Sequence, residues 1–327
     1  MRGRWTKSSS IALSAMANAR SIVFIDRPDW HARQLAQSFA KAGVEPVFVS
    51  LRKCGFEGTA GGARLRLPFF EDSMPLGAFV RSIAAGSFEQ VTLRLSVLHA
   101  LRERGVLVYN DARVIERCVD KSMTSFLLHD SGIPTLPTWT VESLEAARAV
   151  ANSEASPSRP LVLKPLFGSQ GRGLALIDCA AALPPPEAVG GVYYLQHYVT
   201  EGDGRWRDWR VFVIGGRAVA AMVRHGITWK TNASQGAACE AVEPDGQMSA
   251  LAVAAAQCVG AGFAGVDLIR DEAGRLWVLE VNSNPAWSAL QRVTRSRIAE
   301  ELVSDFLSRA AGTTSSSPPR AAIPISI

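Results

Sequence analysis

The sequence predicts an α/β fold over residues 21–110 and an α+β fold over the rest. Up to Tyr109, β-branched runs alternate with helical stretches, which is the pattern of a small parallel sheet. From Leu161 onward, strands are joined by tight turns instead. The chain of 327 residues, 47% of them hydrophobic and 20% charged, is long enough for two or three modules with buried cores.

The first part is predicted to begin with the strand Ser21–Ile25, which ends at Pro28. A helix and three strands are predicted further on, at residues 30–42, 46–49, 79–81 and 106–109. Residues 55–63 are rich in glycine and are predicted to form a loop. An amphipathic helix is predicted from apolar residues at three- and four-residue spacing, namely Phe88, Val91, Leu95 and Leu98.

The second part is predicted to open with one helix over residues 111–131, which Gly132 and Pro134 end. The remaining predicted elements are two strands and two hairpins, at 161–164, 174–177, 210–214 with 217–222, and 263–269 with 276–282. The first hairpin turns at Gly215-Gly216, a strong two-residue turn signal.

Composition excludes several classes of protein. The net charge of +5 is mild and the basic residues are interspersed with acids, so nucleic acid is not an expected partner. No apolar run approaches a membrane span of roughly 18 residues. The five dispersed cysteines argue against structural zinc and suggest reduced thiols in a cytoplasmic protein.

The two ends of the chain are expected to be flexible. Arg2, Arg4 and Lys7 precede a short apolar stretch, so residues 1–20 are either a flexible leader, with translation from Met1 or Met16, or a weak secretion signal. Residues 313–327 have the composition of a disordered tail.

Three oxygen-bearing side chains are predicted to share one face of the second hairpin. Glu280 and Asn282 are two residues apart on one strand, and Asp267 lies opposite Glu280 if the turn spans residues 272–275. The other face would carry Trp277, Leu279 and Val281. Buried carboxylates need a neutralising cation, and Mg²⁺ prefers oxygen ligands. The alternative is an ordinary solvated polar face.

A second cluster follows the strand 161–164. Lys164 ends that strand, and a loop with three glycines follows it, so backbone N–H groups and an ammonium could meet phosphate oxygens. The loop fits neither a Walker A motif nor a dinucleotide fingerprint. The alternative is an ordinary flexible hairpin.

Together with three further pieces, these clusters resemble a known superfamily. The pieces are Asp120–Thr124, Asp208–Arg210 and Trp229–Asn232. In order and spacing the motifs resemble ATP-grasp enzymes, and specifically the RimK-like carboxylate–amine ligases, from about Tyr109 to Leu307. The resemblance implies a pre-ATP-grasp domain (21–110), an ATP-grasp N-lobe (111–195) and a C-lobe (196–312).

The resemblance also implies a role for each matched residue. The expected ATP-binding residues are Lys121, Lys164, Gly168, Ser169, Gln170, Gly171, Gly173, Gln196, His197, Tyr198 and Asp208. Asp208 matches the ribose-binding acid, and residues 196–198 match the segment that lines the adenine. The expected ligands of two Mg²⁺ ions, or of Mn²⁺, are Asp267, Glu280 and Asn282. Residues expected near the transferred phosphate and the substrate are Arg210, Lys230 and Asn232.

The chain departs from the family pattern near the expected substrate. Family members usually have an acid at the position of His197 and an arginine at that of Lys230. They also usually have Arg-Gly-Gly at 235–237 and Pro-Gly at 285–286. Lysine cannot reproduce the two-pronged grip of arginine on a carboxylate. The departures leave the added amino acid open, glutamate included.

Over the whole chain the pattern is most similar to a bacterial RimK-like subgroup that acts in the biosynthesis of tetrahydromethanopterin- and methylofuran-type one-carbon carriers. This likeness implies a small-molecule carboxylate acceptor and an amino-acid donor, which are joined through an acylphosphate. It is also compatible with a homo-oligomer. A ligase for a protein or peptide C-terminus and a non-catalytic ATP-binding regulator are the alternatives. Trp206, Trp209, Trp229 and Trp287 flank the expected site, so the acceptor is predicted to carry an aromatic ring unless they only pack the lobes.

Overall fold

The computed structural model describes residues 20–168 and 171–313. The predicted leader and tail therefore lie almost wholly outside the described residues. By contacts the chain divides into two compact units. Unit 1 comprises residues up to Arg113 together with those from Ala299 onward, and unit 2 comprises Val114–Ile298. The predicted boundaries between pre-ATP-grasp domain, N-lobe and C-lobe stay predictions.

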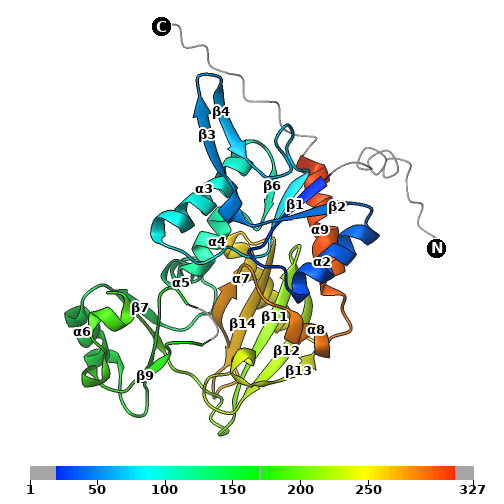
Figure 1. Cartoon of the computed structure of the whole chain (residues 1–327). Coiled ribbons are helices and arrows are strands. Elements are labelled where there is room, and N and C mark those ends of the chain that lie inside the picture. The colour runs from blue at the N-terminus through cyan, green and yellow to red at the C-terminus, as the bar shows by residue number, and fades with distance from the viewer. Residues whose placement is uncertain (1–19, 169–170, 314–327) are drawn as a thin grey trace. The chain divides into compact units, whose positions relative to one another are not determined.

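Unit 1 contains a parallel sheet in the order β2-β1-β5-β6, as the alternation of strand and helix predicted. Figure 1 labels most of its elements. They are β1 (Arg20–Phe24), α2 (Trp30–Lys41), β2 (Glu45–Val49), η1 (Leu51–Lys53), β3 (Gly55–Thr59), β4 (Gly62–Arg66), β5 (Gly77–Val80), α3 (Phe88–Glu103), β6 (Leu107–Tyr109) and α9 (Ile298–Thr313). α4 (Ala112–Val119) begins in unit 1 and continues into unit 2.

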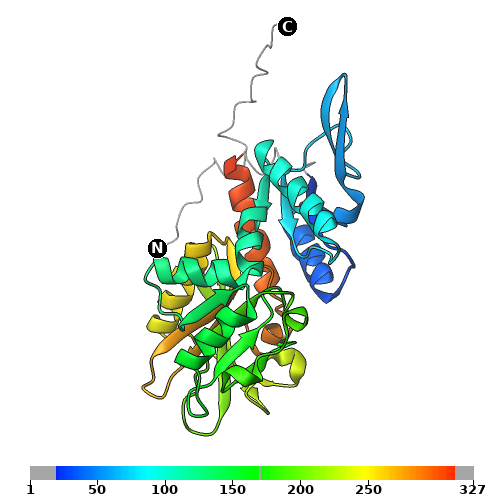
Figure 2. The same ribbon diagram turned by 90° about the vertical axis from the view of Figure 1, so that its left-hand side faces the viewer.

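α9 packs against this sheet although it comes last in the sequence (Figure 2). Phe306 is fully buried, with its ring centroid 5.7 Å from that of Phe39 and 5.8 Å from that of Phe79. The Tyr109 hydroxyl donates to Asp305 at 2.6 Å, and Lys41 donates to Glu300 at 2.6 Å. Apolar packing and polar contacts at its margins thus attach this helix to the parallel sheet.

Two expectations for unit 1 are wrong. The predicted loop 55–63 is largely an antiparallel hairpin formed by β3 and β4 (Figure 1), in which Gly61 and Gly62 lie at the turn and Phe56, Glu57 and Thr59 lie on β3. The helix predicted from Phe88 onward is confirmed as α3, but its buried face is not the expected one. Its buried residues are Arg94, Val97, Leu98 and Leu101, whereas Phe88 is 83% exposed. Arg94 can be buried because its guanidinium donates to the carbonyl of Ala84 at 2.6 Å, which a count of apolar residues does not detect.

Unit 2 contains two antiparallel sheets, as predicted for the α+β part (Figure 1). The small sheet has the order β7-β10-β8-β9, and the large sheet has the order β13-β12-β11-β14-β15. The elements are α5 (Lys121–Asp130), β7 (Thr138–Val141), α6 (Leu144–Glu154), β8 (Leu161–Lys164), β9 (Ala175–Ile177), η2 (Ala180–Ala182), η3 (Pro186–Val189), β10 (Tyr193–His197), β11 (Trp206–Ile214), β12 (Arg217–Gly226), η4 (Ala233–Gln235), β13 (Ala238–Val242), α7 (Gly246–Val259), β14 (Phe263–Arg270), β15 (Leu276–Asn282) and α8 (Ser288–Val293).

Each sheet of unit 2 has its own core. The large sheet packs residues such as Val211, Val266 and Val281 against α7, and the small sheet packs Leu161 and Leu195 against α6. β10 crosses the predicted boundary at 195/196, yet it pairs as a whole with the small sheet. In the part of the chain that the structure describes, no helix is long and apolar enough to span a membrane.

Two details of unit 2 differ from the sequence prediction. The single helix expected over 111–131 is two helices, α4 and α5, which break at Asp120. The backbone of Asp120 is extended, and its carboxylate caps α5 by accepting from Ser122 and Met123. The alternation expected along β15 fails at a β-bulge, which makes Leu279 an extra residue between Val278 and Glu280.

Candidate active site

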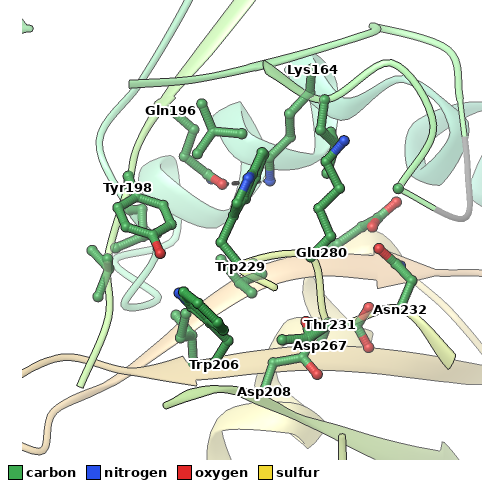
Figure 3. Close-up of a pocket in the computed structure, with 18 of the residues that line it drawn as sticks. Lys164, Gln196, Tyr198, Trp206, Asp208, Trp229, Thr231, Asn232, Asp267 and Glu280 are labelled. Atoms are coloured by element: carbon green, nitrogen blue, oxygen red, sulfur yellow. Dashed lines mark hydrogen bonds between the residues drawn. The ribbon is translucent and has the colours of Figure 1, made fainter. Parts of the chain in front are cut away.

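A pocket in unit 2 gathers most of the predicted site residues (Figure 3). Those that line it are Lys121, Lys164, Gly168, Gly171, Gln196, His197, Tyr198, Asp208, Lys230, Asn232, Asp267 and Glu280. Gly173, Arg210 and Asn282 do not line the pocket. Ser169 and Gln170 lie outside the described residues. Two sheets that are separate in the topology thus contribute side chains to one cavity.

The hairpin of β14 and β15 gives the expected pairing of Asp267 with Glu280, and the metal-binding role of these residues and of Asn282 stays a prediction. Asp267 pairs with Glu280 and Gly265 with Asn282 across the two strands. The prediction that Trp277 and Leu279 share the opposite face with Val281 is wrong. The bulge turns Leu279 toward the pocket beside Glu280, and Trp277 pairs with Ile269, which lines the pocket. Val281 is fully buried in the core on that opposite face.

Asp267 is held by two arginines. The Arg210 guanidinium donates to both carboxylate oxygens, at 2.7 and 2.6 Å, and Arg224 reaches one of them at 3.1 Å. Burial raises the pKa of the Asp267 carboxyl, but the two guanidinium charges lower it by more. The pKa of Asp267 therefore lies below its ordinary value. Asp267 is thus anionic, the form in which a carboxyl group binds a metal ion, and its charge is already balanced by the two arginines.

Arg224 was not predicted from the sequence, yet it joins the two buried acids of the large sheet. Its side chain is 2% exposed, and its guanidinium also contacts both oxygens of Asp208. Thr231 lies nearby and acts with Arg224 to lower the pKa of Asp208, although burial outweighs both and the net direction is up. The ribose-binding role of Asp208 stays a prediction, but in this geometry both of its oxygens are engaged by Arg224.

Glu280 differs from its neighbours, because among the described residues its carboxylate has neither a hydrogen bond nor an ion pair. Its charge acts at longer range on Lys121 and Lys164, whose pKa values it raises against the stronger effect of burial. Asn282 donates from its amide to Gly265 O at 3.2 Å, which leaves its own oxygen as an acceptor. A free carboxylate, a charge-balanced carboxylate and an amide oxygen form a donor set that fits Mg²⁺. In the described parts of the chain, no three His, Cys, Asp or Glu side chains form a metal-binding group, so the fit depends on the amide.

Lys164 and Gln196 contact each other on the small sheet. The Lys164 ammonium donates to Gln196 Oε1 at 2.6 Å, and burial lowers the pKa of Lys164 to about 8 (Figure 3). Gln196 is 1% exposed, and its Nε2 has no hydrogen-bond partner in the described residues. A buried donor without a partner costs about 1–3 kcal/mol, so this amide fits a ligand with ring-nitrogen or oxygen acceptors, as a nucleotide has.

Lys121 holds the glycine-rich loop. Its ammonium donates to the carbonyls of Leu166 at 3.2 Å and Gly168 at 2.9 Å. Gly171 and Gly173 both have positive φ, and a Cβ on Gly171 would collide with Asn232. These two positions therefore require glycine, which lets the loop backbone pass close to the site.

The comparisons with known proteins give the family. A family model described as a RimK-like ATP-grasp domain matches residues 118–306, more than half of the chain. The chain belongs to the RimK-like ATP-grasp family. As a member it is an ATP-dependent acid–amino-acid ligase, so the identification as a RimK-like ligase is confirmed.

Relatives and solved structures agree with this assignment. A tetrahydromethanopterin:alpha-L-glutamate ligase of Methanococcus maripaludis is 30% identical over 88% of this chain and 98% of its own length. A probable alpha-L-glutamate ligase of Aliivibrio fischeri is 33% identical over 67% of this chain and 72% of its own length. A RimK domain ATP-grasp protein from Sphaerobacter thermophilus has a TM-score of 0.63 at 21% identity, over 88% of this chain and all of that one. The ATP-grasp ligase PsnB has the same fold, with a TM-score of 0.69 at 21% identity, over 90% of this chain and 99% of that one.

Proposed function

We propose that the protein uses ATP and Mg²⁺ to join glutamate to a carboxylate of a one-carbon carrier of the tetrahydromethanopterin type. The observation that carries the proposal is the lone Glu280 carboxylate, which faces two lysines in a pocket whose other acids are already balanced. A carboxylate repels the phosphates of a nucleotide, so this site can stabilise a phosphate chain only when bound cations balance the charge of Glu280. The named activity of the Methanococcus relative supports the choice of acceptor and donor.

In this proposal the residues of the chain bind and orient the reactants. Lys121 and Lys164 neutralise the phosphates, and Gln196 donates to the base through its unpaired amide. Asp267, Glu280 and Asn282 would hold two Mg²⁺ ions, or Mn²⁺, with Glu280 shared between them. When bound, these ions would supply positive charge that offsets the repulsion between the phosphates and an incoming carboxylate.

The reaction would run through an acylphosphate. The acceptor carboxylate attacks the γ-phosphorus and ADP leaves; the donor amine then attacks the acyl carbon and inorganic phosphate leaves. Arg210 and Lys230 would stabilise the charge on the transferred phosphoryl group and the acceptor, and Asn232 would position it. The side chains described in the pocket include no Ser-His or Cys-His pair, so covalent catalysis by the protein is not part of the proposal.

The test is a mass-spectrometric assay of the full chain with ATP, Mg²⁺, tetrahydromethanopterin and a panel of amino acids. The proposal expects ADP to form only when both acceptor and amine are present, and the acceptor to gain one or more glutamyl masses. A peptide ending in glutamate serves as the competing acceptor. Faster modification of that peptide would favour a protein-tail ligase, and ADP formation independent of any amine would contradict a ligase reaction on these substrates.

A further inference from the structure

The β3–β4 hairpin of unit 1 forms a sheet of its own and extends away from the parallel sheet (Figure 1, Figure 2). Within the described residues, neither of its strands pairs with any further strand. Phe56 is 50% exposed, and of the two strands only Gly55 and Leu65 are partly covered. A hairpin of two strands is at best marginally stable in water, so this one is expected to gain stability from a partner.

The hairpin has one apolar face and one charged face. Residues that pair across two strands share a face, and successive pairs alternate between the two faces. Phe56 pairs with Leu65 on the apolar face, and Glu57 pairs with Arg64 on the charged face, where Arg66 lies as well. Among the described residues, the side chains of Glu57 and Arg66 have neither a hydrogen bond nor an ion pair. The hairpin is therefore amphipathic, with an unburied apolar face and two unengaged charges of opposite sign.

The two outer edges of the hairpin differ. Because the hairpin turns through a two-residue loop, Phe56 and Gly58 direct their backbone N–H and C=O groups to the outer edge of β3. In the described part of the chain, no hydrogen bond reaches these groups. On the edge of β4, by contrast, Arg104 donates to the carbonyl of Ala63 at 3.1 Å. β3 is thus the open edge, and it has no proline, lysine or bulge that would block pairing.

Two glycines of β3 indicate that another backbone approaches this edge. Gly55 and Gly58 do not have positive φ, and a Cβ on either would meet nothing within 4 Å. The fold of the single chain therefore does not require glycine at these positions, where glycine weakens the strand. Since the register of β3 with β4 contains no bulge, close approach of a second strand is the remaining reason for them.

A second copy of β3 fits this edge in one antiparallel register. When Phe56 lies opposite the partner's Phe56, the Leu65 and Phe56 side chains of both copies form one continuous apolar row. On the other face, the partner's Glu57 then lies opposite Gly55, beside Arg66. Because Gly55 has no side chain, Arg66 can reach across it to the partner's carboxylate. A register with Glu57 opposite the partner's Glu57 would instead bring like charges together.

We propose that the β3–β4 hairpin is a dimerisation arm, and that two copies of this chain pair β3 with β3 about a two-fold axis at Phe56. The four strands then form one antiparallel sheet in the order β4-β3-β3-β4. Both copies use the same surface, so a single pairing closes the assembly at two chains. A contact of this size suits a dissociation constant of about 1–50 µM. None of these residues lines the pocket, so the dimer does not depend on the proposed ligase reaction.

The test is sedimentation velocity of the full chain at about 1–100 µM, a range that brackets the expected dissociation constant. The wild type should shift from one chain to two as the concentration rises. Phe56→Lys places two ammonium groups opposite each other in the apolar row, so its dissociation constant should be at least about 100-fold higher. Phe88→Lys is the matched control, because this phenylalanine is 83% exposed at the start of α3, outside the hairpin. It should dimerise as the wild type does.

An exchange of charges tests the register. Glu57→Arg and Arg66→Glu should each weaken self-association by about ten-fold, because each homodimer has two contacts between like charges. An equimolar mixture of the two variants should recover most of the lost affinity, since the mixed dimer restores both contacts between opposite charges. Melting temperatures verify that every variant is folded. A wild type that stays monomeric at ~100 µM, a dimer that Phe56→Lys leaves intact, or a mixture that associates no better than the single variants would overturn the proposal.

Discussion

The two sheets that line the pocket balance their buried charges in different ways. On the large sheet, Asp208, Asp267, Arg210 and Arg224 neutralise one another through short, two-pronged contacts. On the small sheet, Lys164 has one neutral partner, Gln196, and burial lowers its pKa to about 8. Apart from Glu280, the charges of the large sheet are thus balanced within the described residues, whereas the small sheet has groups that need a ligand.

This difference separates stability from binding. A buried ion pair that loses one member leaves an uncompensated charge, which typically costs 3–5 kcal/mol. A buried lysine with a lowered pKa already carries a desolvation cost, so its removal can relieve the fold. The large sheet should therefore respond to mutation mainly in stability and the small sheet mainly in nucleotide affinity. Glu280 is the exception on the large sheet, because it has no partner to lose.

Glu280→Gln should give the largest effect, on activity alone. It removes the one carboxylate of the large sheet that no described side chain balances, and with it the proposed bridge between metal ions. ADP formation should fall by at least about 10³-fold, a loss of roughly 4 kcal/mol in transition-state stabilisation, while the melting temperature stays within a few degrees. Glu272→Gln, an exposed residue in the turn of the same hairpin, is the control and should keep full activity. Substantial turnover by Glu280→Gln would remove Glu280 from the site.

Arg224→Met and Lys164→Met should act in opposite directions on stability. The first leaves Asp208 and Asp267 short of a shared cation, so unfolding should become easier by about 3–5 kcal/mol, which lowers the melting temperature by roughly 10 °C. The second removes a costly buried charge and should leave the melting temperature unchanged or raise it. Nucleotide affinity should fall sharply in Lys164→Met. An equal loss of stability in both variants would break the comparison between the sheets.

The charge pairs of the large sheet show where prediction from sequence stops. The glycine pair at 215–216 correctly predicted the hairpin, and Ile214 does pair with Arg217. If that register continued without a bulge, Asp208 would pair with Val223. Arg224 would then point to the opposite face of the sheet from Asp208. A bulge at Val219 shifts the pairing by one residue, so that Asp208 meets Arg224. Motif spacing was enough to predict Asp208 and Asp267 as site residues. Arg224 was not predicted, because its position depends on a bulge that tertiary packing determines.

The same limit explains the outcome at Leu279 and Asp120. The predicted four-residue turn would pair Asp267 with Glu280 directly. In the structure Arg270 pairs with Leu276, which offsets the register by one residue, and the bulge at Leu279 restores the pairing of Asp267 with Glu280. The same bulge turns Leu279 toward the pocket. In the sequence Asp120 lies within a long helical pattern, so one continuous helix was predicted. Its capping contacts in the structure show that α5 begins there. The fold class and most pocket residues were predictable because they follow from periodicity and motif order. Bulges and charge networks were not, because they depend on neighbours distant in sequence.

Nucleotide binding should weaken above pH 8 through Lys164. Its pKa is lowered from 10.5 to about 8, mainly by burial, so the free protein loses this charge as the pH rises through 8. Phosphates favour the charged form, and ADP binding near pH 8.5–9 should therefore take up protons, which calorimetry in buffers of different ionisation enthalpy measures. Lys121, whose pKa is also lowered, would add to the effect. In Lys164→Met the proton uptake should shrink to the part that Lys121 supplies.

The same shift has a consequence for stability with the opposite sign. The unfolded chain keeps the lysine proton up to about pH 10.5, whereas the folded chain releases it near 8. Between these values the unfolded state binds more protons, so the contribution of Lys164 to the free energy of unfolding rises with pH. A fall of that contribution over pH 8–10, seen as the difference between wild type and Lys164→Met, would contradict the assigned pKa.

His197→Glu should have the smallest effect, because its partner is a single half-buried acid. His197 Nε2 lies 3.5 Å from Glu154 Oε2, and the imidazole ring packs 5.1 Å from the ring of Trp139. Burial lowers the pKa of His197, so at pH 7 the ring is largely neutral and little attraction is lost. A glutamate there meets Glu154 as a like charge in a partly solvated position, which costs about 1 kcal/mol. The melting temperature should fall by about 2–4 °C. Glu154→Gln in that background should restore most of the loss, and if it does not, the cost comes from lost packing on Trp139 instead of charge.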